Sequence, residues 1–132
     1  MELIVKAYGE LTRDELFEIL KLRNAVFIVE QECPYQDIDE TDREAYHIFL
    51  RDEEGIEAYL RVFRSEKCPQ EARIGRVIAV KRRCGLGSRI LKEGIRLAQV
   101  PEGAYFLNCA PLNLTGTEGA PCRAVLITDL LP

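Results

Sequence analysis

The first hydrophobic pattern in the chain is a short alternating segment, followed by one with the period of a helix. Residues Leu3 to Tyr8 read as a β-strand that ends at Gly9, and apolar residues then recur three and four positions apart, as on one helix face. Thr12 and Glu15 have the spacing of a capping box, in which each side chain binds the other residue's backbone N–H. The sequence therefore predicts a helix from about Arg13 to Phe27.

The middle of the chain alternates between apolar and polar positions, as strands do. Tyr46 to Arg51 reads as a strand, and Asp52-Glu53-Glu54-Gly55 is typical of a hairpin turn, because glycine supplies the positive φ that such a turn needs. Ile56 to Arg64 is the returning strand, and Arg73 to Val80 is a further long strand. We expect the returning strand to place Ile56, Ala58, Leu60 and Val62 on one face and Glu57, Tyr59, Arg61 and Phe63 on the other.

The last third begins with a helical pattern over Ser88 to Gln99, followed by a short strand at Tyr105 to Leu107. The order of elements is β-α-β-β-β-α-β. It predicts a single domain over residues 1–132, a three-layer α/β (α+β) sandwich around a mixed, mostly antiparallel sheet. The last β-α-β step should be a right-handed crossover.

Composition narrows the class of protein. The 132 residues fit one domain, and the net charge of −4 argues against general binding of nucleic acid. No segment reaches the ~18 apolar residues of a membrane span, and the N-terminus lacks the pattern of a signal peptide. Five cysteines without a C-x-x-C pair, and a single histidine, predict reduced thiols in the cytoplasm and no metal site.

Charge is distributed unevenly along the chain. Acidic residues crowd positions 37–44, which we expect to form a solvated loop, whereas Lys81, Arg82, Arg83, Arg89 and Lys92 form the strongest basic cluster. The acidic segment does not fit a calcium loop, because the sixth position counted from Asp37 is Asp42 rather than glycine. A basic cluster on an acidic protein favours a specific anionic ligand over a polyanion.

The basic cluster contains the sharpest motif of the sequence, Arg82-Arg83-Cys84-Gly85-Leu86-Gly87-Ser88, between a predicted strand and a predicted helix. Free N–H groups in the first turn of a helix, with glycines that let a ligand approach, form a cradle for an anion. A P-loop is excluded because no Gly-Lys-Ser/Thr follows, and a dinucleotide fingerprint is excluded because position 90 is isoleucine. A glycine-containing turn with surface arginines remains the alternative.

Two blocks resemble a known family. Arg82-x-x-Gly85-x-Gly87 resembles the Q/R-x-x-G-x-G/A signature of GNAT acetyltransferases, at the same strand-to-helix junction. The segment from Leu22 to Asp39, L-R-N-A-V-F-I-V-E-Q-E-C-P-Y-Q-D-I-D, is similar to the L-R-x-x-V-F-V-V-E-Q-x-C-P-Y-x-x-x-D stretch of the ElaA-type branch. The resemblance covers Leu11 to Gln99 and implies a sheet of the acyl-CoA N-acyltransferase type.

The resemblance also implies a ligand and a reaction. In the family, the glycine turn binds the pyrophosphate of coenzyme A, and the strand before it binds the pantetheine arm and supplies the oxyanion donor. The co-substrate would be acetyl-CoA, the acceptor a primary amine, and no metal would take part. The residues that match the coenzyme A site are Val77, Ile78, Ala79, Val80, Arg82, Arg83, Cys84, Gly85, Leu86, Gly87 and Ser88.

Four residues are candidates for the acceptor side of the reaction. Glu30 follows an apolar run, where burial can raise the pKa of a carboxylate into the range of a proton acceptor. Gln31, Tyr35 and His47 are candidates for the amine pocket. The alternatives are a surface carboxylate for Glu30, simple packing for Tyr35 and a hydrogen-bonded structural role for His47.

The likeness to the family ends after Gln99. The F-Y-x-x-x-G-F segment, whose tyrosine commonly protonates the departing thiolate, is missing, and Gly116 to Cys122 is rich in glycine and proline. Either divergence or a shifted reading frame would produce such a tail. An incomplete C-terminal part predicts low stability or a homodimer that covers the sheet. Three hypotheses remain: an active acetyltransferase, a coenzyme A-binding protein without turnover, and an interaction protein.

Overall fold

The computed structural model describes residues 1–65, 68–98, 106–111 and 122–127. The elements run in chain order as β1 (Glu2–Ala7), η1 (Tyr8–Glu10), α1 (Arg13–Arg23), η2 (Asn24–Glu30), α2 (Thr41–Glu44), β2 (Tyr46–Asp52), β3 (Gly55–Ser65), β4 (Cys68–Ala79), α3 (Leu86–Leu97), β5 (Phe106–Pro111) and β6 (Cys122–Ile127). The atypical tail falls largely outside the described residues, which include only β5 and β6 from it.

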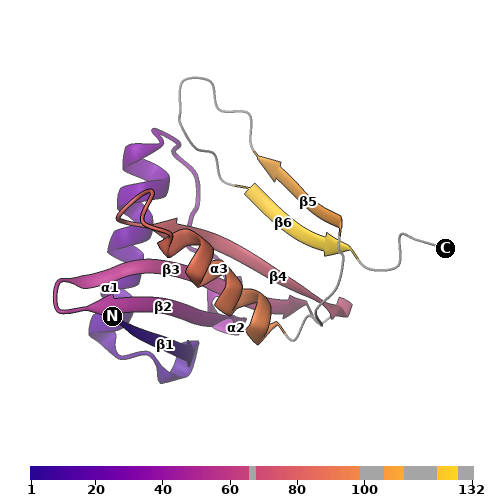
Figure 1. Ribbon diagram of the computed structural model, residues 1–132, viewed down its shortest axis with the longest axis horizontal. Helices are drawn as coiled ribbons and strands as arrows, with labels where there is room; N and C mark the ends of the chain where they lie inside the picture. The colour runs from indigo at the N-terminus through magenta and orange to yellow at the C-terminus, as the bar shows by residue number, and fades with distance from the viewer. Residues whose placement is uncertain (66–67, 99–105, 112–121, 128–132) are drawn as a thin grey trace.

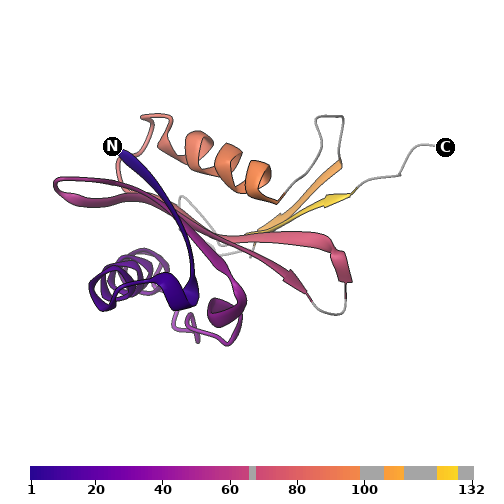
Figure 2. The same ribbon diagram turned by 90° about the horizontal axis from the view of Figure 1, so that it is seen from below.

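The strands form one sheet in the order β1-β2-β3-β4-β6-β5, and the neighbouring strands that the structure describes are antiparallel. Figure 2 shows α3 on one face of this sheet and α1 and α2 on the other, and Figure 1 shows α3 crossing in front of the strands. The predicted three-layer sandwich is therefore confirmed. The hairpin predicted at Asp52 to Gly55 joins β2 to β3.

The first helix begins as the sequence predicts. The backbone N–H of Glu15 donates to Thr12 Oγ1 at 3.1 Å, and the N–H of Thr12 donates to Glu15 Oε2 at 2.8 Å, which completes the capping box. Lys6 Nζ lies 2.7 Å from Glu15 Oε1. Burial alone would raise the pKa of Glu15, but these contacts with Lys6 and Thr12 outweigh it and lower the pKa below its usual value.

The predicted end of that helix is wrong. The α-helical hydrogen bonds stop at Arg23, and the chain continues as a π-helix, η2, to Glu30. Four consecutive branched or aromatic residues, 26–29, occupy this segment, and such side chains lose freedom in a tight α-turn. The wider π-turn buries Phe27 and leaves Val29 in solvent.

The two faces of the sheet carry separate hydrophobic cores. Ala58, Leu60 and Val62 of β3 pack beneath α3, whereas Tyr59 packs on the side of α1. Ile56 was expected on the face of Ala58 but joins the α1 side, because the β2–β3 ladder shifts register between Leu50 and Arg51.

The other face of β3 is polar in sequence and yet buried. Glu57 is 5% exposed and Arg61 is 4% exposed, since α1, η2 and the segment that follows them cover this side of the sheet. Strand β4 begins at Cys68 rather than at Arg73, so the predicted loop of residues 65–71 is shorter than expected. Across the described residues, none of the helices has the length and apolar character needed to cross a bilayer.

Candidate active site

The C-terminal half of β4 has one paired edge and one open edge. On one side Ile78 pairs with Tyr59 and Ala79 pairs with Ala58 of β3. On the other side, within the described strands, β4 meets β6 through the single pair Ile74↔Ala124. The edge of β4 beyond Ile74 therefore faces no described strand.

The backbone of this open edge carries hydrogen-bonding groups. The N–H of Val80 donates to Glu57 O of β3 at 2.9 Å. Successive N–H groups of a strand point to opposite edges of that strand. The N–H groups of Ala79 and Val77 therefore point away from β3, to the open edge. Just before them, Arg76 has a φ of 55° and the β3–β4 ladder shifts register, so the strand bulges at this point.

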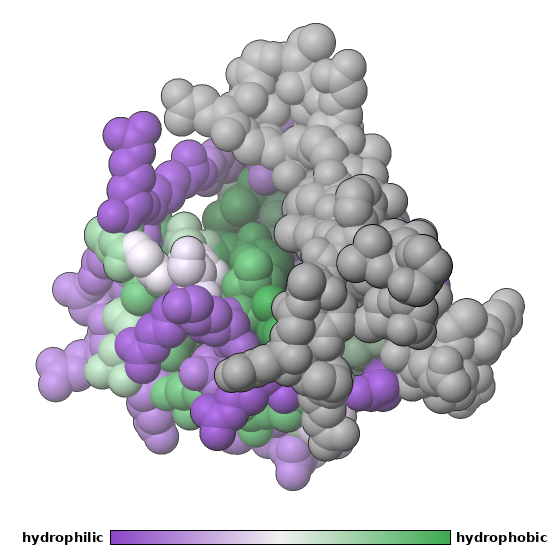
Figure 3. Space-filling model, turned by 45° about the vertical axis from the view of Figure 1, so that its right-hand side comes forward, coloured by the Kyte–Doolittle hydropathy of each residue, from purple (hydrophilic) through white to green (hydrophobic). Residues whose placement is uncertain are grey.

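A cleft of about 770 Å³ lies between η2 and this edge of β4. Seven of the predicted site residues line it: Glu30, Gln31, Val77, Ile78, Ala79, Val80 and Arg82. It is also lined by Leu22, Ala25, Val26, Phe27, Asp39, Thr41, Arg61, Phe63, Arg73, Ile74, Gly75 and Arg76. Figure 3 shows apolar side chains gathered in a hollow of the molecule with polar side chains around it.

The turn after β4 opens α3 without a side-chain cap. Gly85 is the N-cap residue and has a φ of 76°, which favours glycine. The first helical hydrogen bond runs from the N–H of Arg89 to Gly85 O at 3.0 Å, so the N–H groups of residues 86–88 have no partner within the helix. A Cβ at Gly87 would lie 3.8 Å from Ala79 Cβ, and the helix therefore starts directly against the end of β4.

The other residues predicted in this turn differ in their surroundings. Arg83, Cys84 and Ser88 are exposed, and Cys84 Sγ lies 3.3 Å from Arg82 O. Leu86 is 9% exposed and packs in the core beneath α3, so only its backbone is available to a ligand.

Glu30 and Arg82 form an ion pair across the cleft. The sequence assigns the first to proton transfer and the second to phosphate. Both side chains are about half exposed, at 48% for Glu30 and 60% for Arg82, so Glu30 does not have the buried surroundings that the sequence analysis considers. Exposed pairs of this kind contribute at most about 1 kcal/mol.

One wall of the cleft belongs to a charge network of three arginines and three aspartates, in which Arg23, Arg61, Asp37 and Asp42 are buried, Arg76 is partly buried and Asp39 is exposed. Arg23 Nε lies 2.9 Å from Asp37 Oδ2, and Arg23 Nη1 lies 2.6 Å from Asp42 Oδ1. Arg61 Nη1 lies 2.8 Å from Asp39 Oδ1 and 2.5 Å from Asp42 Oδ1.

The third arginine of the network, Arg76, comes from the bulge of β4. Its Nε donates to Asp37 Oδ1 at 2.6 Å, and its guanidinium stacks over the rings of Phe27 and Tyr35. The acidic segment 37–44 is therefore not a solvated loop throughout. Asp37 and Asp42 are 8% and 4% exposed, because guanidinium groups from three distant elements neutralise them.

The network shifts the pKa values of Arg23, Arg61, Asp39 and Asp42 toward their charged forms. Burial alone would raise the pKa of Asp42, but the hydrogen bonds and charges of Arg23 and Arg61 outweigh it and lower the pKa below its usual value. For Arg23, burial opposes the charge, yet the hydrogen bond with Asp42 prevails and raises the pKa.

Tyr35 and His47, both predicted for the amine pocket, do not belong to the residues that line the cleft. Tyr35 donates its hydroxyl to Asp37 Oδ1 at 3.1 Å, and burial, opposed by Arg76 and aided by Asp37, raises its pKa to about 12. Its placement favours the packing alternative.

His47 is 1% exposed, and both ring nitrogens have partners. Nε2 lies 2.9 Å from the carbonyl oxygen of Asp42, which can only accept, so Nε2 carries the hydrogen. Nδ1 then accepts from the hydroxyl of Tyr59 at 2.9 Å. Burial lowers the pKa of His47 below 6.5. These contacts favour the structural alternative over a substrate contact.

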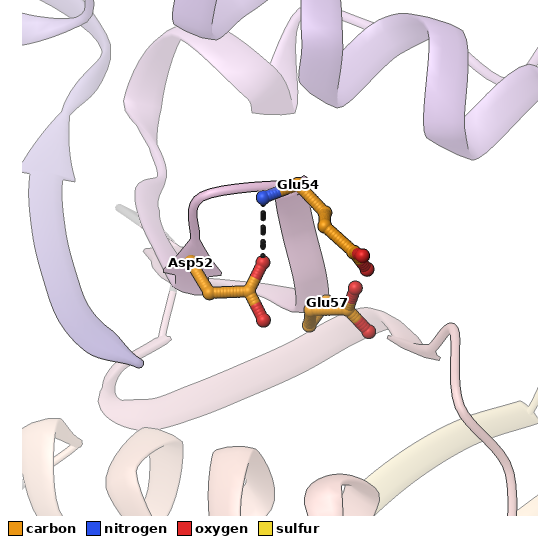
Figure 4. Close-up of side chains that lie close together, drawn as sticks. All are labelled: Asp52, Glu54 and Glu57. Carbon is orange, nitrogen blue, oxygen red and sulfur yellow. Dashed lines mark hydrogen bonds between the residues drawn. The ribbon is translucent and has the colours of Figure 1, made fainter.

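One group of acidic side chains among the described residues is compact enough to hold a metal ion. The carboxylates of Asp52, Glu54 and Glu57 each offer an oxygen, and these atoms lie within 4.8 Å of one another, as Figure 4 shows. Lys81 Nζ lies 3.2 Å from Glu57 Oε1 and 3.3 Å from Glu54 Oε2. The ammonium group offsets one of the three negative charges and connects the turn after β4 to the β2–β3 hairpin.

Sequence reasoning did not identify Arg61, Arg76 and Asp39 as residues of the cleft. The sequence did contain a signal, because Arg61 occupies an inward-facing position of a long strand. A buried arginine requires an acidic partner in the interior. The acids of segment 37–44 were the candidates, but their distance in sequence concealed the pairing.

Comparison with known proteins finds relatives of this chain in several organisms. UPF0039 protein C11D3.02c of Schizosaccharomyces pombe is 33% identical over 102 residues, which cover 75% of this chain and 67% of that protein. Protein ElaA of Escherichia coli is 42% identical over 73 residues, which cover 54% of this chain and 48% of ElaA. The chain thus spans about half the length of ElaA in that match.

Solved structures agree with these relatives. An acyl-CoA N-acyltransferase from Pseudomonas aeruginosa superposes with a TM-score of 0.69 and 32% identity, covering 74% of this chain and 70% of that one. The crystal structure of Escherichia coli ElaA gives a TM-score of 0.74 with 27% identity and covers 95% and 97%. The antiparallel sheet with its helices is that of the acyl-CoA N-acyltransferase fold of the GNAT superfamily. Within that superfamily, the chain belongs to the ElaA-type family.

A shorter sequence match involves a protein of a different name. A stretch of 38 residues, 29% of this chain, is 53% identical to Cyclase-like protein 1 of Oryza sativa subsp. japonica. The match covers 14% of that protein, which is too little to support a conclusion about function. No protein-family model matches the chain.

Proposed function

We propose that the protein is an acetyl-CoA-dependent N-acetyltransferase that transfers an acetyl group to a primary amine. The observation that carries this proposal is the junction of two backbone features. The open edge of β4, at Val77 and Ala79, leads directly into the uncapped N-terminus of α3 at Gly85. A strand edge suits the amides of a pantetheine arm, and a helix N-terminus suits a pyrophosphate. In coenzyme A the pantetheine arm is joined to the pyrophosphate, in the same order as the strand edge and the helix N-terminus along this chain.

The reaction follows from this placement. The amine nitrogen attacks the thioester carbonyl, a C–N bond forms, and the C–S bond breaks. The N–H of Val77 stabilises the oxyanion, and Glu30 takes the proton of the amine, directly or through water. The departing thiolate takes up a proton, and no tyrosine is among the described residues that line the cleft. Arg82 must leave Glu30 to meet the phosphates, and this frees the carboxylate.

A second candidate is a coenzyme A-binding protein without turnover. The exposure of Glu30 and the absence of a tyrosine from the described lining of the cleft favour it. Both candidates require the same coenzyme A site, so binding of coenzyme A distinguishes them from an interaction protein. Release of the free thiol of coenzyme A in the presence of an amine then distinguishes the enzyme from the binding protein.

Isothermal titration of the protein with acetyl-CoA, and with free coenzyme A alongside, tests the site. We expect micromolar binding of both. Gly85→Val should weaken it at least tenfold, because a branched side chain does not tolerate the positive φ at that position. Gly9→Val is the matched control, since a Cβ there meets nothing within 4 Å. A folded Gly85→Val protein that binds like the wild type would refute the cradle.

A further inference from the structure

The turn between β4 and α3, residues 80–85, contains two residues with a left-handed backbone conformation. Gly85 has a φ of 76°, which suits glycine, but Arg83 has a φ of 60°, which is unfavourable for a residue with a Cβ. A strained conformation persists only where the surrounding structure holds it. The contacts that hold this turn therefore determine whether its free N–H groups and arginines keep the arrangement described above.

The helical end of the turn is held by packing. Leu86 is buried in the core beneath α3, and a Cβ at Gly87 would lie 3.8 Å from Ala79 Cβ. Both contacts belong to the first turn of α3 and follow the strained residues. They leave the first half of the turn, residues 80–83, without support from the core.

The strand end of the turn is held by a single residue of β3, Glu57. The backbone N–H of Val80 donates to Glu57 O at 2.9 Å, and Lys81 Nζ lies 3.2 Å from Glu57 Oε1. Two successive residues at the start of the turn are thus bound to Glu57, one through its main chain and the other through its side chain. A contact of this kind fixes both the position and the direction in which the chain leaves β4.

Glu57 is suited to this role because it is buried and Lys81 is not. Glu57 is 5% exposed and belongs to a central strand, whereas the side chain of Lys81 is 52% exposed. The ammonium group of Lys81 also lies 3.3 Å from Glu54 Oε2, and Figure 4 shows the carboxylates of Glu54 and Glu57 close together. Hydrogen bonds from Glu57 and Glu54 raise the pKa of Lys81 above its usual value, so Lys81 is charged at neutral pH.

We propose that Glu57 and Lys81 are positioning residues of the coenzyme A site, and that their ion pair holds the strained turn in the form that binds pyrophosphate. Neither residue has to touch the ligand. The pantetheine arm lies along β4, whose pairing with β3 at Ile78 and Ala79 does not involve the ion pair. The inference rests on the proposed function, because that function places the pyrophosphate at this turn.

The first test compares two ligands by nuclear magnetic resonance titration: acetyl-CoA, and S-acetylpantetheine, which carries the thioester and the arm but no pyrophosphate. Lys81→Met should weaken binding of acetyl-CoA about fivefold and leave binding of S-acetylpantetheine unchanged. Lys81→Arg keeps a cation for Glu57 and should bind both ligands like the wild type. Lys21→Met is the matched control, because Lys21 is exposed on α1, on the other side of the sheet. Equal effects of Lys81→Met on the two ligands, or no effect on acetyl-CoA, would overturn the proposal.

The second test uses Glu57→Gln to distinguish positioning from a direct contact between Lys81 and the phosphates. Glu57→Gln removes a negative charge beside the turn and releases Lys81 from its ion pair. If Lys81 bound the phosphates directly, this change would tighten binding of acetyl-CoA. Positioning by the pair predicts the opposite sign, a loss of about fivefold, and a double variant with Lys81→Met that binds no more weakly than the weaker single variant.

The outcomes separate this inference from the proposed function. Unchanged or tighter binding of acetyl-CoA by folded Glu57→Gln protein would overturn the positioning role and leave the proposed function standing. A wild-type protein that does not bind acetyl-CoA would remove the proposed function, and the positioning role with it. Circular dichroism of each variant confirms that it is folded, and Lys81→Met, a change at an exposed side chain, provides the test even if Glu57→Gln does not fold.

Discussion

At the scale of single residues, the guanidinium of Arg23 has no exposure to solvent and yet keeps its charge. Its donors reach Asp37 and Asp42, two acids that enter the interior only because arginines accompany them. Removal of one member of such a network leaves an uncompensated charge in a place that water cannot reach. The network therefore holds segment 37–44 against the sheet and shapes one wall of the cleft.

Replacement of Arg23 by methionine should reveal this role. Arg23→Met keeps an unbranched apolar stem but leaves Asp42 and Asp37 short of a partner, and we expect a loss of about 3–5 kcal/mol in the free energy of unfolding. Urea denaturation followed by circular dichroism measures it. Arg43→Met is the control: its pair with Glu40 is solvent-exposed, so we expect a change of at most about 0.5 kcal/mol. Equal losses in the two variants would contradict the importance of the network.

Some residue roles could be read from the sequence, and others could not. Thr12 and Glu15 were predictable because a capping box is a local contact with fixed spacing. Asp42 and Arg61 were not, since they lie 19 positions apart and meet only after the sheet has formed. For Tyr35 and His47, the residue type indicated chemistry, but it gave no sign of the hydrogen bonds that join Tyr35 to Asp37 and His47 to Tyr59 and Asp42.

At the scale of elements, Gly94 lets α3 lie against Leu60 of β3 where a larger residue would not fit. A Cβ at Gly94 would lie 3.0 Å from Leu60 Cδ2 and 3.1 Å from Leu60 Cδ1. The close approach presses α3 onto β3 and so determines where its N-terminus, and the turn at Gly85, meets β4. The period of α3 predicted the helix and its inner face, but periodicity gives no distance between layers.

Two glycine-to-alanine variants within α3 test this approach. Alanine favours a helix over glycine by about 1 kcal/mol, so Gly87→Ala, with only an ordinary contact at 3.8 Å, should leave the stability unchanged or raise it. Gly94→Ala gains the same preference but crowds Leu60, and overpacking of this kind costs about 1–3 kcal/mol. We expect Gly94→Ala to be the less stable of the two by thermal and urea unfolding. The opposite ranking would show that α3 can move outward freely.

At the scale of the whole molecule, stability should depend on pH in one direction. His47, Asp39 and Asp42 all have folded-state pKa values below their usual ones: burial is the first cause for His47, and for the aspartates the arginines overcome burial. A group with a lowered pKa stabilises the fold above its unfolded pKa and loses that contribution as the pH falls. All three groups therefore favour the folded state at neutral pH.

We expect the free energy of unfolding to fall in two stages as the pH drops from 7. The first stage begins below about 6.5, where an unfolded His47 takes up a proton, and the second below about 4, where unfolded aspartates do. Urea unfolding at a series of pH values measures both. His47→Asn should flatten the first stage and leave the second. A wild-type stability that stays constant from pH 7 to pH 5 would contradict the buried, neutral His47.

The layered sheet as a whole followed from the order and the period of the predicted elements, and from the resemblance over Leu11 to Gln99. What the sequence did not determine was the path of the chain between α1 and β2, where a π-helix and a charge network replace regular periodicity. Neither has a local signature: the first depends on how side chains fit against the sheet, and the second on partners far along the chain.

The π-helix also constrains which changes in chain length this family can accept. Each residue added to or removed from a helix turns everything beyond it by about 100° around the axis. A deletion anywhere in residues 24–29 would let η2 relax to an α-helix and would swing Glu30 and Gln31 away from the cleft. The length of this part of the chain therefore matters as much as its residue types. A one-residue deletion would remove the Glu30 side chain from the cleft, as a substitution of Glu30 does, although the residue itself is unchanged.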